Sequence, residues 1–234
     1  MHVIIFDLEM NNVYKKERTN SIVEIGAVKV KLENLEIQQY FQTYIMPHVG
    51  IGKGTMKFIQ MDENDVRKAV SPKQALSEFV EWIGKDYYLC SWGDIDKLYL
   101  IQECVNESFP LSWLKNYNDI QPAIANAIVG KKIIKLKDAI RESGIKEEGY
   151  SHSAMYDAVN TSSLFIKYHD QIELKTSTAS ENYSYSKDLY RKCNKCGIVK
   201  YFTKLHRIKK KPTNFCRDCH LENQILKRKE KFGE

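Results

Sequence analysis

The stretch His2-Val3-Ile4-Ile5-Phe6-Asp7-Leu8-Glu9-Met10 opens the chain and has the apolar, β-branched composition of a buried strand. Because side chains alternate between the two faces of a strand, Asp7 and Glu9 share one face. The opposite face carries Phe6, Leu8 and Met10. Two neighbouring carboxylates on an apolar strand are costly unless something neutralises them. The pattern therefore favours either a divalent-cation site of hard oxygen ligands, suited to Mg²⁺ or Mn²⁺, or an edge strand with one wet face.

Further strands and helices follow this segment in an order that predicts the fold class. Residues 21–30 and 36–46 read as two more strands, which together with the first suggest an antiparallel meander. Ser71-Pro72 then predicts the start of a helix that ends at Gly84. A fourth strand is expected at 87–92, and helical periodicity returns near 97–104, 136–143 and 153–168. We therefore expect an α/β fold, a mixed sheet with helices on its faces.

Acidic residues recur at two later points of the chain. Ser91-Trp92-Gly93-Asp94-Ile95-Asp96 follows the fourth predicted strand and opens a helix, where an acid can also serve only as an N-cap. His152-Ser153-Ala154-Met155-Tyr156-Asp157 opens the last long helix. A single histidine is more often structural than catalytic. His152 becomes a candidate because three groups of carboxylates accompany it.

Together these motifs resemble those of the DEDDh exonucleases, the DnaQ-like branch of the ribonuclease H fold. The resemblance rests on Phe6-Asp7-Leu8-Glu9, on Ile22-Val23-Glu24-Ile25-Gly26-Ala27-Val28, on Ser91-Trp92-Gly93-x-x-Asp96 and on His152-x-Ala154-x-x-Asp157. It covers roughly residues 1–170, with all motifs in order. The Ser-Trp-Gly element looks like the Eri-type subgroup, which includes the histone-mRNA 3′ exonuclease.

The resemblance implies a ribonuclease H-like mixed sheet and a 3′→5′ exonuclease that releases nucleoside 5′-monophosphates from single-stranded nucleic acid. It further implies two Mg²⁺ or Mn²⁺ ions about 3.5–4 Å apart. Asp7, Glu9 and Asp157 would hold one ion. Asp7 and Asp96 would hold the other, and His152 would be the general base. The Trp-Gly-x-x-Asp spacing favours Asp96 as the middle acid, whereas an aliphatic residue directly after the acid, common in related exonucleases, favours Asp94.

The sequence leaves alternatives open both for the substrate and for whether the chain is catalytically active. The Eri-type motif leads us to expect RNA, but no residue shows how a 2′-hydroxyl would be recognised, so DNA stays open. One alternative is a nucleic-acid-binding or scaffolding protein that has lost its chemistry on the same fold. Another is a proofreading exonuclease that acts on DNA beside a polymerase. Glu24 is interpreted as structural, and Cys90 and Cys104 as small core residues.

The C-terminal part carries two Cys-x-x-Cys pairs separated by 19 residues, Cys193 with Cys196 and Cys216 with Cys219. This spacing predicts one structural Zn²⁺ held by four thiolates, with disulfides as the alternative. Tyr201 and Phe202, together with the run Lys209-Lys210-Lys211, fit contacts to single-stranded nucleic acid. A protein-docking surface is the other interpretation of this module.

Charge and composition suggest the domain boundaries. Residues 187–234 hold 15 Lys/Arg against 5 Asp/Glu, whereas residues 1–186 hold 21 against 25. We expect an exonuclease domain at 1–172, a polar linker at 173–186 and a basic zinc module at 187–234. The first residues lack the pattern of a signal peptide, and no apolar run approaches the roughly 20 residues that span a bilayer. We therefore expect a cytoplasmic protein with no membrane partner.

Overall fold

The computed structural model describes residues 1–11, 21–48, 50–187 and, beyond these, only the short segments 190–192, 195, 199–201, 207–208 and 211–212. In this part of the chain, none of the helices combines the length and the apolar character needed to span a bilayer.

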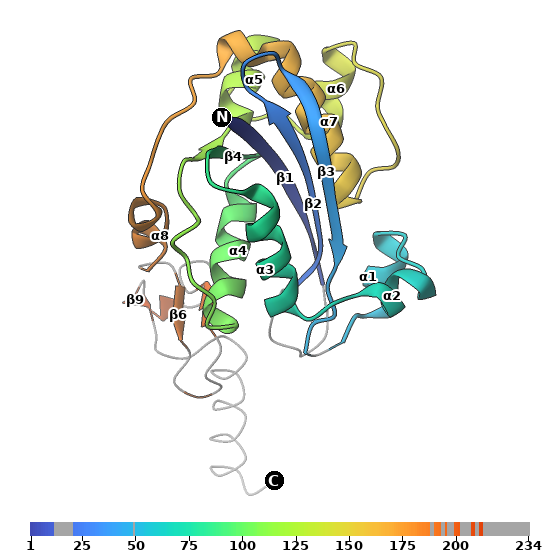
Figure 1. Ribbon diagram of the computed structural model, residues 1–234, viewed down its shortest axis with the longest axis vertical. Coiled ribbons are helices and arrows are strands. Elements are labelled where there is room, and N and C mark those ends of the chain that lie inside the picture. Colours follow the sequence, from blue (N-terminus) through green and yellow to red (C-terminus); the bar gives the residue numbers. More distant parts are fainter. Residues whose placement is uncertain are drawn as a thin grey trace, which may run out of the picture.

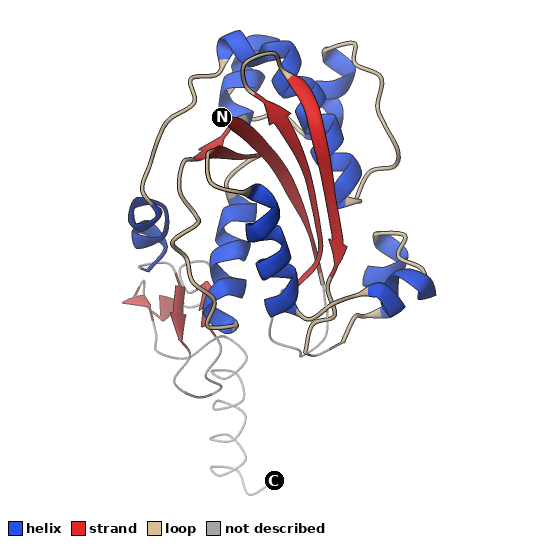
Figure 2. Cartoon of the chain, in the orientation of Figure 1, coloured by secondary structure: helices blue, strands red, loops and turns tan. Residues whose placement is uncertain are grey.

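A mixed sheet of five strands forms the centre of the molecule, in the order β3-β2-β1-β4-β5 (Figure 2). The strands are β1 (His2–Met10), β2 (Ile22–Lys31), β3 (Glu36–Tyr44), β4 (Tyr87–Ser91) and β5 (Tyr117–Asp119). The first three pair antiparallel, so the predicted meander is confirmed. β4 pairs parallel with β1, and β5 pairs parallel with β4. β1 is thus the central strand, and the carboxyl ends of β1, β4 and β5 meet at one edge of the sheet.

Helices cover both faces of this sheet (Figure 1). On one face, α3 (Pro72–Ile83) and α4 (Ile95–Asn106) pack against the side chains of Ile4, Phe6 and Leu8. On the other face, α5 (Gln121–Val129), α6 (Leu136–Glu142) and α7 (Ala154–Tyr168) pack against Val3 and Ile5. The alternation predicted for the first strand is therefore confirmed. The helix predicted from Ser71-Pro72 to Gly84 is also confirmed, with Ser71 as its N-cap and Gly84 as its C-cap.

Several short elements carry no clear periodicity in the sequence. They are α1 (Lys53–Phe58), α2 (Glu63–Lys68), η1 (His169–Gln171), α8 (Ala179–Lys187) and the small strands β6 (Tyr190–Lys192), β7 (Val199–Tyr201), β8 (Arg207–Ile208) and β9 (Lys211–Pro212). α2 depends on its N-terminus rather than on an apolar stripe. The side chain of Asp62 accepts from the backbone N–H groups of Asn64 and Asp65. Such local capping stabilises a short helix that packing alone does not.

The segment predicted as a polar linker, 173–186, lies on the domain and includes most of α8. The side-chain amide of Asn118 exchanges hydrogen bonds with the backbone of Lys175. The Nδ2 of Asn182 donates to the carbonyl of Leu114 at 2.9 Å, and α8 packs against α4. The domain boundaries at 172 and 187 remain predictions.

The N-terminus of α7 lies directly on β2 because Gly26 has no side chain. A Cβ built on Gly26 would stand 2.1 Å from the carbonyl carbon of Ala154 and 2.2 Å from the backbone nitrogen of Met155. These neighbours are backbone atoms and cannot rotate away. Gly26 also pairs with Asp7 across β1 and β2, so the close approach occurs beside the acidic strand.

Substitution Gly26→Ala should therefore lower the free energy of unfolding by about 2–3 kcal/mol or more, as overpacking at a rigid contact does. Gly54→Ala is the matched control, because Gly54 lies in α1 with no atom within 4 Å of its would-be Cβ. Alanine in a helix should leave stability equal or raise it by up to about 1 kcal/mol. Urea denaturation of both variants measures the difference, and equal midpoints would contradict the tight contact.

Candidate active site

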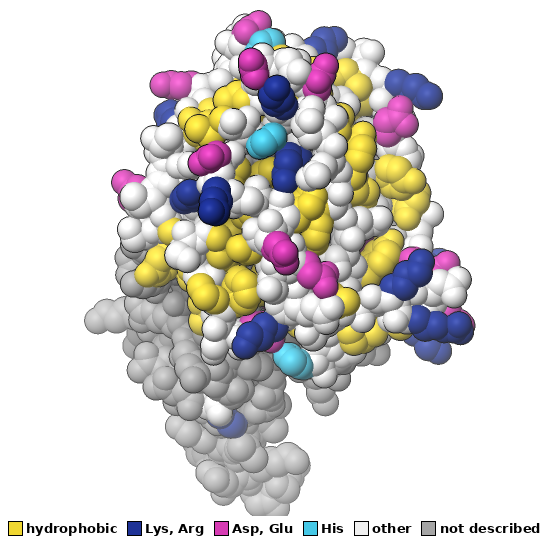
Figure 3. Space-filling model, viewed as in Figure 1, with side chains coloured by type: hydrophobic (Ala, Val, Ile, Leu, Met, Phe, Trp, Pro, Cys, Tyr) yellow, Lys and Arg dark blue, Asp and Glu magenta, His cyan; other side chains and the backbone are white. Residues whose placement is uncertain are grey.

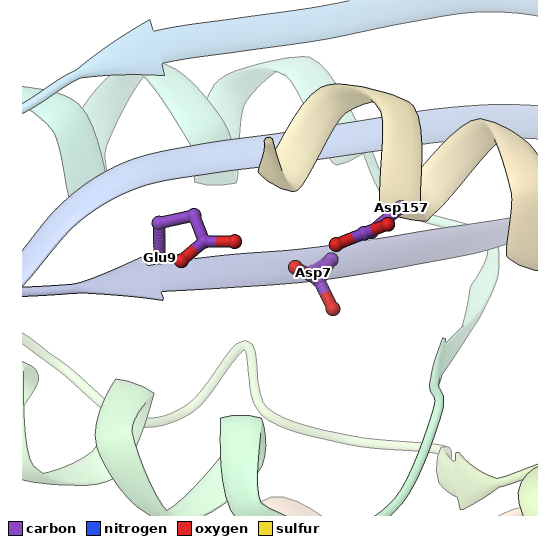
Figure 4. Close-up of side chains that lie close together, drawn as sticks. All are labelled: Asp7, Glu9 and Asp157. Carbon is purple, nitrogen blue, oxygen red and sulfur yellow. The ribbon is translucent and has the colours of Figure 1, made fainter. Parts of the chain in front are cut away.

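Three carboxylates meet at the carboxyl end of β1 (Figure 4). Asp7 and Glu9 project from β1, and Asp157 projects from the first turn of α7. Each offers a carboxylate oxygen, and these oxygens all lie within 4.8 Å of one another. The structure thus brings together three acids that are 2 and 150 positions apart in the sequence. Hard oxygen donors at this spacing suit a divalent cation such as Mg²⁺ or Mn²⁺.

Asp96 is the fourth acid, and it differs sharply from its neighbour Asp94. Asp96 lies in the first turn of α4 with only 6% of its surface exposed, whereas Asp94 is exposed. Among the charges around Asp7, that of Asp96 contributes most to raising the pKa of Asp7. The parallel pairing of β1 with β4, in which Ile5 lies opposite Cys90, brings the start of α4 to the same edge as Asp7.

The Ser-Trp-Gly turn that leads to Asp96 is fixed by residues from β5. Gly93 has φ +96°, a backbone conformation that favours glycine. Its N–H donates to Oδ1 of Asp119 at 3.0 Å, and the hydroxyl of Tyr117 donates to its carbonyl at 2.8 Å. No sequence motif points to Asp119. Its only signal is an acidic residue at the end of a strand three residues long.

Glu24 on β2 holds the start of α7. Its carboxylate accepts from the backbone N–H groups of Ala154 (3.1 Å) and Met155 (3.3 Å) and from the hydroxyl of Ser153 (3.3 Å). Gln42 on β3 donates a further bond at 2.8 Å. Glu24 is fully buried and acts as an N-terminal cap supplied by a distant strand. This role agrees with its interpretation as structural, and the helix that it caps carries Asp157.

His152 lies beside the acidic cluster and is exposed. Its backbone adopts φ +69°, and its N–H donates to Oδ2 of Asp157 at 3.2 Å. The imidazole lies against the ring of Phe58 on α1, with ring centroids 4.2 Å apart. α1 is in turn anchored to the end of β1, because Oδ1 of the buried Asn11 accepts from Gly52 and Thr55. The segment before α7 and the helix α1 therefore meet at His152, next to the carboxylates.

Burial and mutual repulsion dominate the electrostatics of the cluster. Burial, then the charges of Asp157, Glu24 and Asp96, raise the pKa of Glu9 to about 8. Burial also raises the pKa of Asp96 to about 8, and it raises the pKa of both Asp7 and Asp157. The four carboxylates resist being ionised together because they are buried and repel one another. A divalent cation bound by their oxygens would supply the compensating positive charge. The residues present therefore fit the metal site that the sequence predicts.

The predicted zinc site and most of the predicted nucleic-acid contacts lie outside the described residues. These are Cys193, Cys196, Cys216, Cys219, Phe202, Lys209 and Lys210. Of the remaining two, Tyr201 ends β7 and Lys211 begins β9.

Comparison with known families decides the class of this chain. The Exonuclease family model matches residues 4–165, which hold every member of the acidic cluster and His152. The chain belongs to the Exonuclease family. It has the α/β, ribonuclease H-like fold that the motifs predicted.

The relatives of this chain are distant. An ERI1 exoribonuclease 2 of Xenopus laevis is 26% identical over 191 residues, covering 70% of this chain and 28% of that protein. A 3′-5′ exoribonuclease 1 of Rattus norvegicus is 24% identical, covering 70% and 51%. A DNA polymerase III of PolC type from Clostridium perfringens is 25% identical, covering 77% and 12%. The chain spans about half the length, or less, of these curated relatives.

Solved structures share its fold. The nuclease domain of 3′hExo, a DEDDh family member bound to rAMP, has a TM-score of 0.66 at 21% identity and covers 75% of this chain and 96% of that chain. Escherichia coli Exonuclease I in complex with a dT13 oligonucleotide has a TM-score of 0.57 at 11% identity and covers 80% and 42%.

The raised pKa values predict how the stability of this chain depends on pH and metal. Without metal, these acids hold protons in the folded state that they lose when unfolded. Because the folded state binds these protons more tightly, the protonated acids contribute to the free energy of unfolding. This contribution is fully present below the ordinary carboxyl pKa near 4 and is lost as pH rises towards about 8. A bound cation keeps the acids ionised, so protons compete with it.

Thermal unfolding with and without Mn²⁺ should therefore show a larger Mn²⁺-induced rise in Tm at pH 8 than at pH 5.5. The Asp157→Asn variant should lose most of this rise. An equal rise at both pH values, or one that survives in Asp157→Asn, would contradict a metal site at the cluster.

Proposed function

We propose that this chain is a metal-dependent exonuclease that removes nucleoside 5′-monophosphates one at a time from the 3′ end of single-stranded nucleic acid, with RNA preferred over DNA. The observation that carries the proposal is the cluster of Asp7, Glu9 and Asp157 with carboxylate oxygens within 4.8 Å of one another. The buried Asp96 and the exposed His152 border this cluster.

The carboxylates divide between two cation positions in this proposal. Asp7, Glu9 and Asp157 hold one ion, and Asp7 and Asp96 hold the other. We assign Asp96 rather than Asp94 because Asp96 is buried and contributes most to the charge that Asp7 experiences, whereas Asp94 faces solvent. Two divalent ions bound there, Mg²⁺ or Mn²⁺, would neutralise the phosphate and activate a water.

His152 acts as the general base. It removes a proton from the water that attacks the last phosphodiester, and the bond from phosphorus to the 3′ oxygen of the preceding nucleotide breaks. The products are a nucleoside 5′-monophosphate and a strand shortened by one residue with a free 3′-hydroxyl. Imidazole changes its protonation state near neutral pH, which suits this role. The backbone bond from His152 to Asp157 ties the base to the metal-holding helix.

The preference for RNA rests on relatives rather than on contacts. The curated relatives include exoribonucleases, and 3′hExo was solved with rAMP bound. A structure similar to this chain, with a TM-score of 0.64 at 17% identity, concerns recognition of a histone mRNA stem-loop by a 3′-exonuclease. These similarities support single-stranded RNA, or the single-stranded 3′ end of a folded RNA, as the substrate class.

A DNA proofreading exonuclease is the second candidate function. The similarity to DNA polymerases III of PolC type, at 25% identity over 77% of this chain, favours it. A binding or scaffolding protein without chemistry is a weaker candidate, because the chain has all four acids and the histidine.

We further propose, from the sequence, a C-terminal zinc module. Cys193, Cys196, Cys216 and Cys219 would hold one structural Zn²⁺, and the basic and aromatic residues around them would contact single-stranded nucleic acid. A protein partner for this module is the alternative. Metal analysis of the purified chain, with one Zn²⁺ expected per molecule, addresses the first part.

Digestion of 5′-labelled single-stranded RNA and DNA of matched sequence tests the proposed activity. With Mn²⁺ or Mg²⁺, the RNA should shorten from its 3′ end one nucleotide at a time, and EDTA should stop the reaction. His152→Ala should lower kcat by about 10²- to 10⁴-fold, as loss of a general base does. Asp7→Asn should abolish turnover.

His169→Ala is the matched control for the histidine. His169 lies at the far end of α7 and pairs with Asp170 at 2.9 Å, so its loss should leave the rate unchanged. Faster digestion of a mismatched DNA primer than of RNA would favour proofreading instead. No metal-dependent shortening of either strand would reject the exonuclease reaction.

A further inference from the structure

A lysine-rich segment lies between α5 and α6 and has no role in the reaction described above. Residues 131–137 read Lys-Lys-Ile-Ile-Lys-Leu-Lys, and all four lysines are exposed. Between Asp119 and Asp138 the sequence contains no acidic residue. The segment therefore carries four positive charges with no acid among them, although residues 1–186 as a whole hold more acidic than basic residues.

These lysines have no acidic partner in the part of the chain that the structure describes. None of the four forms a salt bridge there, and the nearest acid in sequence, Asp138, pairs with Arg141 at 3.1 Å. Acidic and basic side chains are interspersed on the face seen in Figure 3. A run of exposed, unneutralised cations is the usual footprint of a polyanion contact.

Two hydrogen bonds fix this segment at the edge of the active site. The carbonyl of Ile134 accepts from Nε1 of Trp92 at 3.2 Å and from Nε2 of Gln121 at 2.9 Å. Trp92 belongs to the turn that leads to Asp96, and Gln121 is the first residue of α5, two residues after the end of β5. The lysines flank this anchor, with Lys135 next to it and Lys132 two residues before it.

Apolar packing supports the same placement. Ile134 and Leu136 belong to the apolar cluster that includes Trp92 and Met155. Met155 lies two residues before Asp157 in the first turn of α7. Ile134 and Leu136, on either side of Lys135, thus pack toward the core, whereas Lys135 itself and the preceding residues 131–133 are exposed.

The acidic site itself makes such a segment useful. Its four carboxylates repel the phosphates of an approaching strand, and bound cations act only at the last phosphodiester. The nucleotides behind the 3′ end need separate positive charges if the strand is to stay in place for successive cuts. The backbone contacts that supply this affinity do not read the base sequence.

We propose that Lys131, Lys132, Lys135 and Lys137 form a track that binds the phosphates of the single strand behind its 3′-terminal nucleotide. This assignment rests on the proposed exonuclease function. The ligand class is a single-stranded polynucleotide, held by charge and without sequence preference.

The test compares the double variant Lys132→Gln/Lys135→Gln with the control Lys31→Gln/Lys85→Gln in the full chain. Lys31 pairs with His2, and Lys85 lies two residues before Tyr87, which also pairs with His2. Both control lysines therefore lie at the opposite end of the sheet from Glu9. Each variant removes two positive charges, so the change in net charge is matched.

Binding of a fluorescent 20-nucleotide RNA is measured against salt concentration, with Ca²⁺ replacing Mn²⁺ to prevent cleavage. Each phosphate contact on a single strand contributes roughly −0.7 to the slope of log K against log salt. The slope of Lys132→Gln/Lys135→Gln should therefore be shallower by about 1.4, and that of the control should match the wild type. Equal slopes for both double variants would overturn the track.

A second measurement separates the track from the reaction. The p-nitrophenyl ester of thymidine 5′-monophosphate has one phosphodiester and no upstream strand. With Mn²⁺, the ratio of kcat/KM for the 20-nucleotide RNA to that for the ester should fall at least five-fold in Lys132→Gln/Lys135→Gln. An unchanged ratio would overturn the proposal, because the two lysines would then affect hydrolysis of the RNA and of the ester equally rather than binding of the upstream strand. A wild type that binds RNA through these lysines but hydrolyses neither substrate would reject the exonuclease function and leave the track standing.

Discussion

The contact between the first turn of α7 and strand β2 is the constraint on which the site depends. Gly26 leaves space that the backbone of Ala154 and Met155 fills, and Glu24 accepts hydrogen bonds from the N–H groups of the same two residues. One residue pair on β2 thus fixes both the distance and the axis of α7. Since β2 pairs with β1, this contact also fixes Asp157 relative to Asp7 and Glu9. Carboxylates from a helix and a strand that are far apart in sequence thereby come close enough to bind one ion.

This arrangement concentrates negative charge at the carboxyl end of the central strand of the sheet. β1 lies between β2 and β4 with both faces covered, so its carboxylates cannot move apart when they ionise. Their pKa values rise instead, to about 8 for Glu9. The folded chain is therefore destabilised near neutral pH relative to a chain with uncharged residues at these positions. A divalent cation would offset this cost, which links the stability of the domain to the ion that its chemistry requires.

The sequence predicted the fold where periodicity is strong. The alternation in 2–10 separated two faces that pack against different helix layers, and Ser71-Pro72 and Gly84 marked the ends of α3. It did not predict α1, α2, β5 or α5. α1 and α2 are six residues long, β5 is three, and α5 has apolar residues on most of its surface rather than in a stripe. Capping by Asp62 and anchoring by Asn11 produce α2 and α1, and neither effect leaves a periodic pattern.

The candidate site was predicted to a similar degree. Motif spacing pointed to the acids and to His152. The acids on the first strand stood out because like charges on an apolar strand require an explanation, and His152 stood out because these carboxylates accompany it. The roles of Glu24 and Asp119 depend on contacts across the sheet, from β2 to α7 and from β5 to the turn before α4. A single buried acid in a strand gives no sign of which helix it will cap. Such tertiary contacts became visible only in three dimensions.

Calorimetric titration with Mn²⁺ tests the central claim most directly, by comparing wild type with Glu24→Ala and Glu24→Gln. Glu24 is not one of the three clustered ligands, yet Glu24→Ala should weaken Mn²⁺ binding at least ten-fold because α7 loses its cap. Glu24→Gln, which keeps one acceptor oxygen, should lie between. Asp62→Ala removes the cap of α2, at a cost of about 0.5–2 kcal/mol, and should bind Mn²⁺ as the wild type does. Wild-type affinity in Glu24→Ala, or an equal loss in Asp62→Ala, would contradict the claim that the docking of α7 assembles the metal-binding acids.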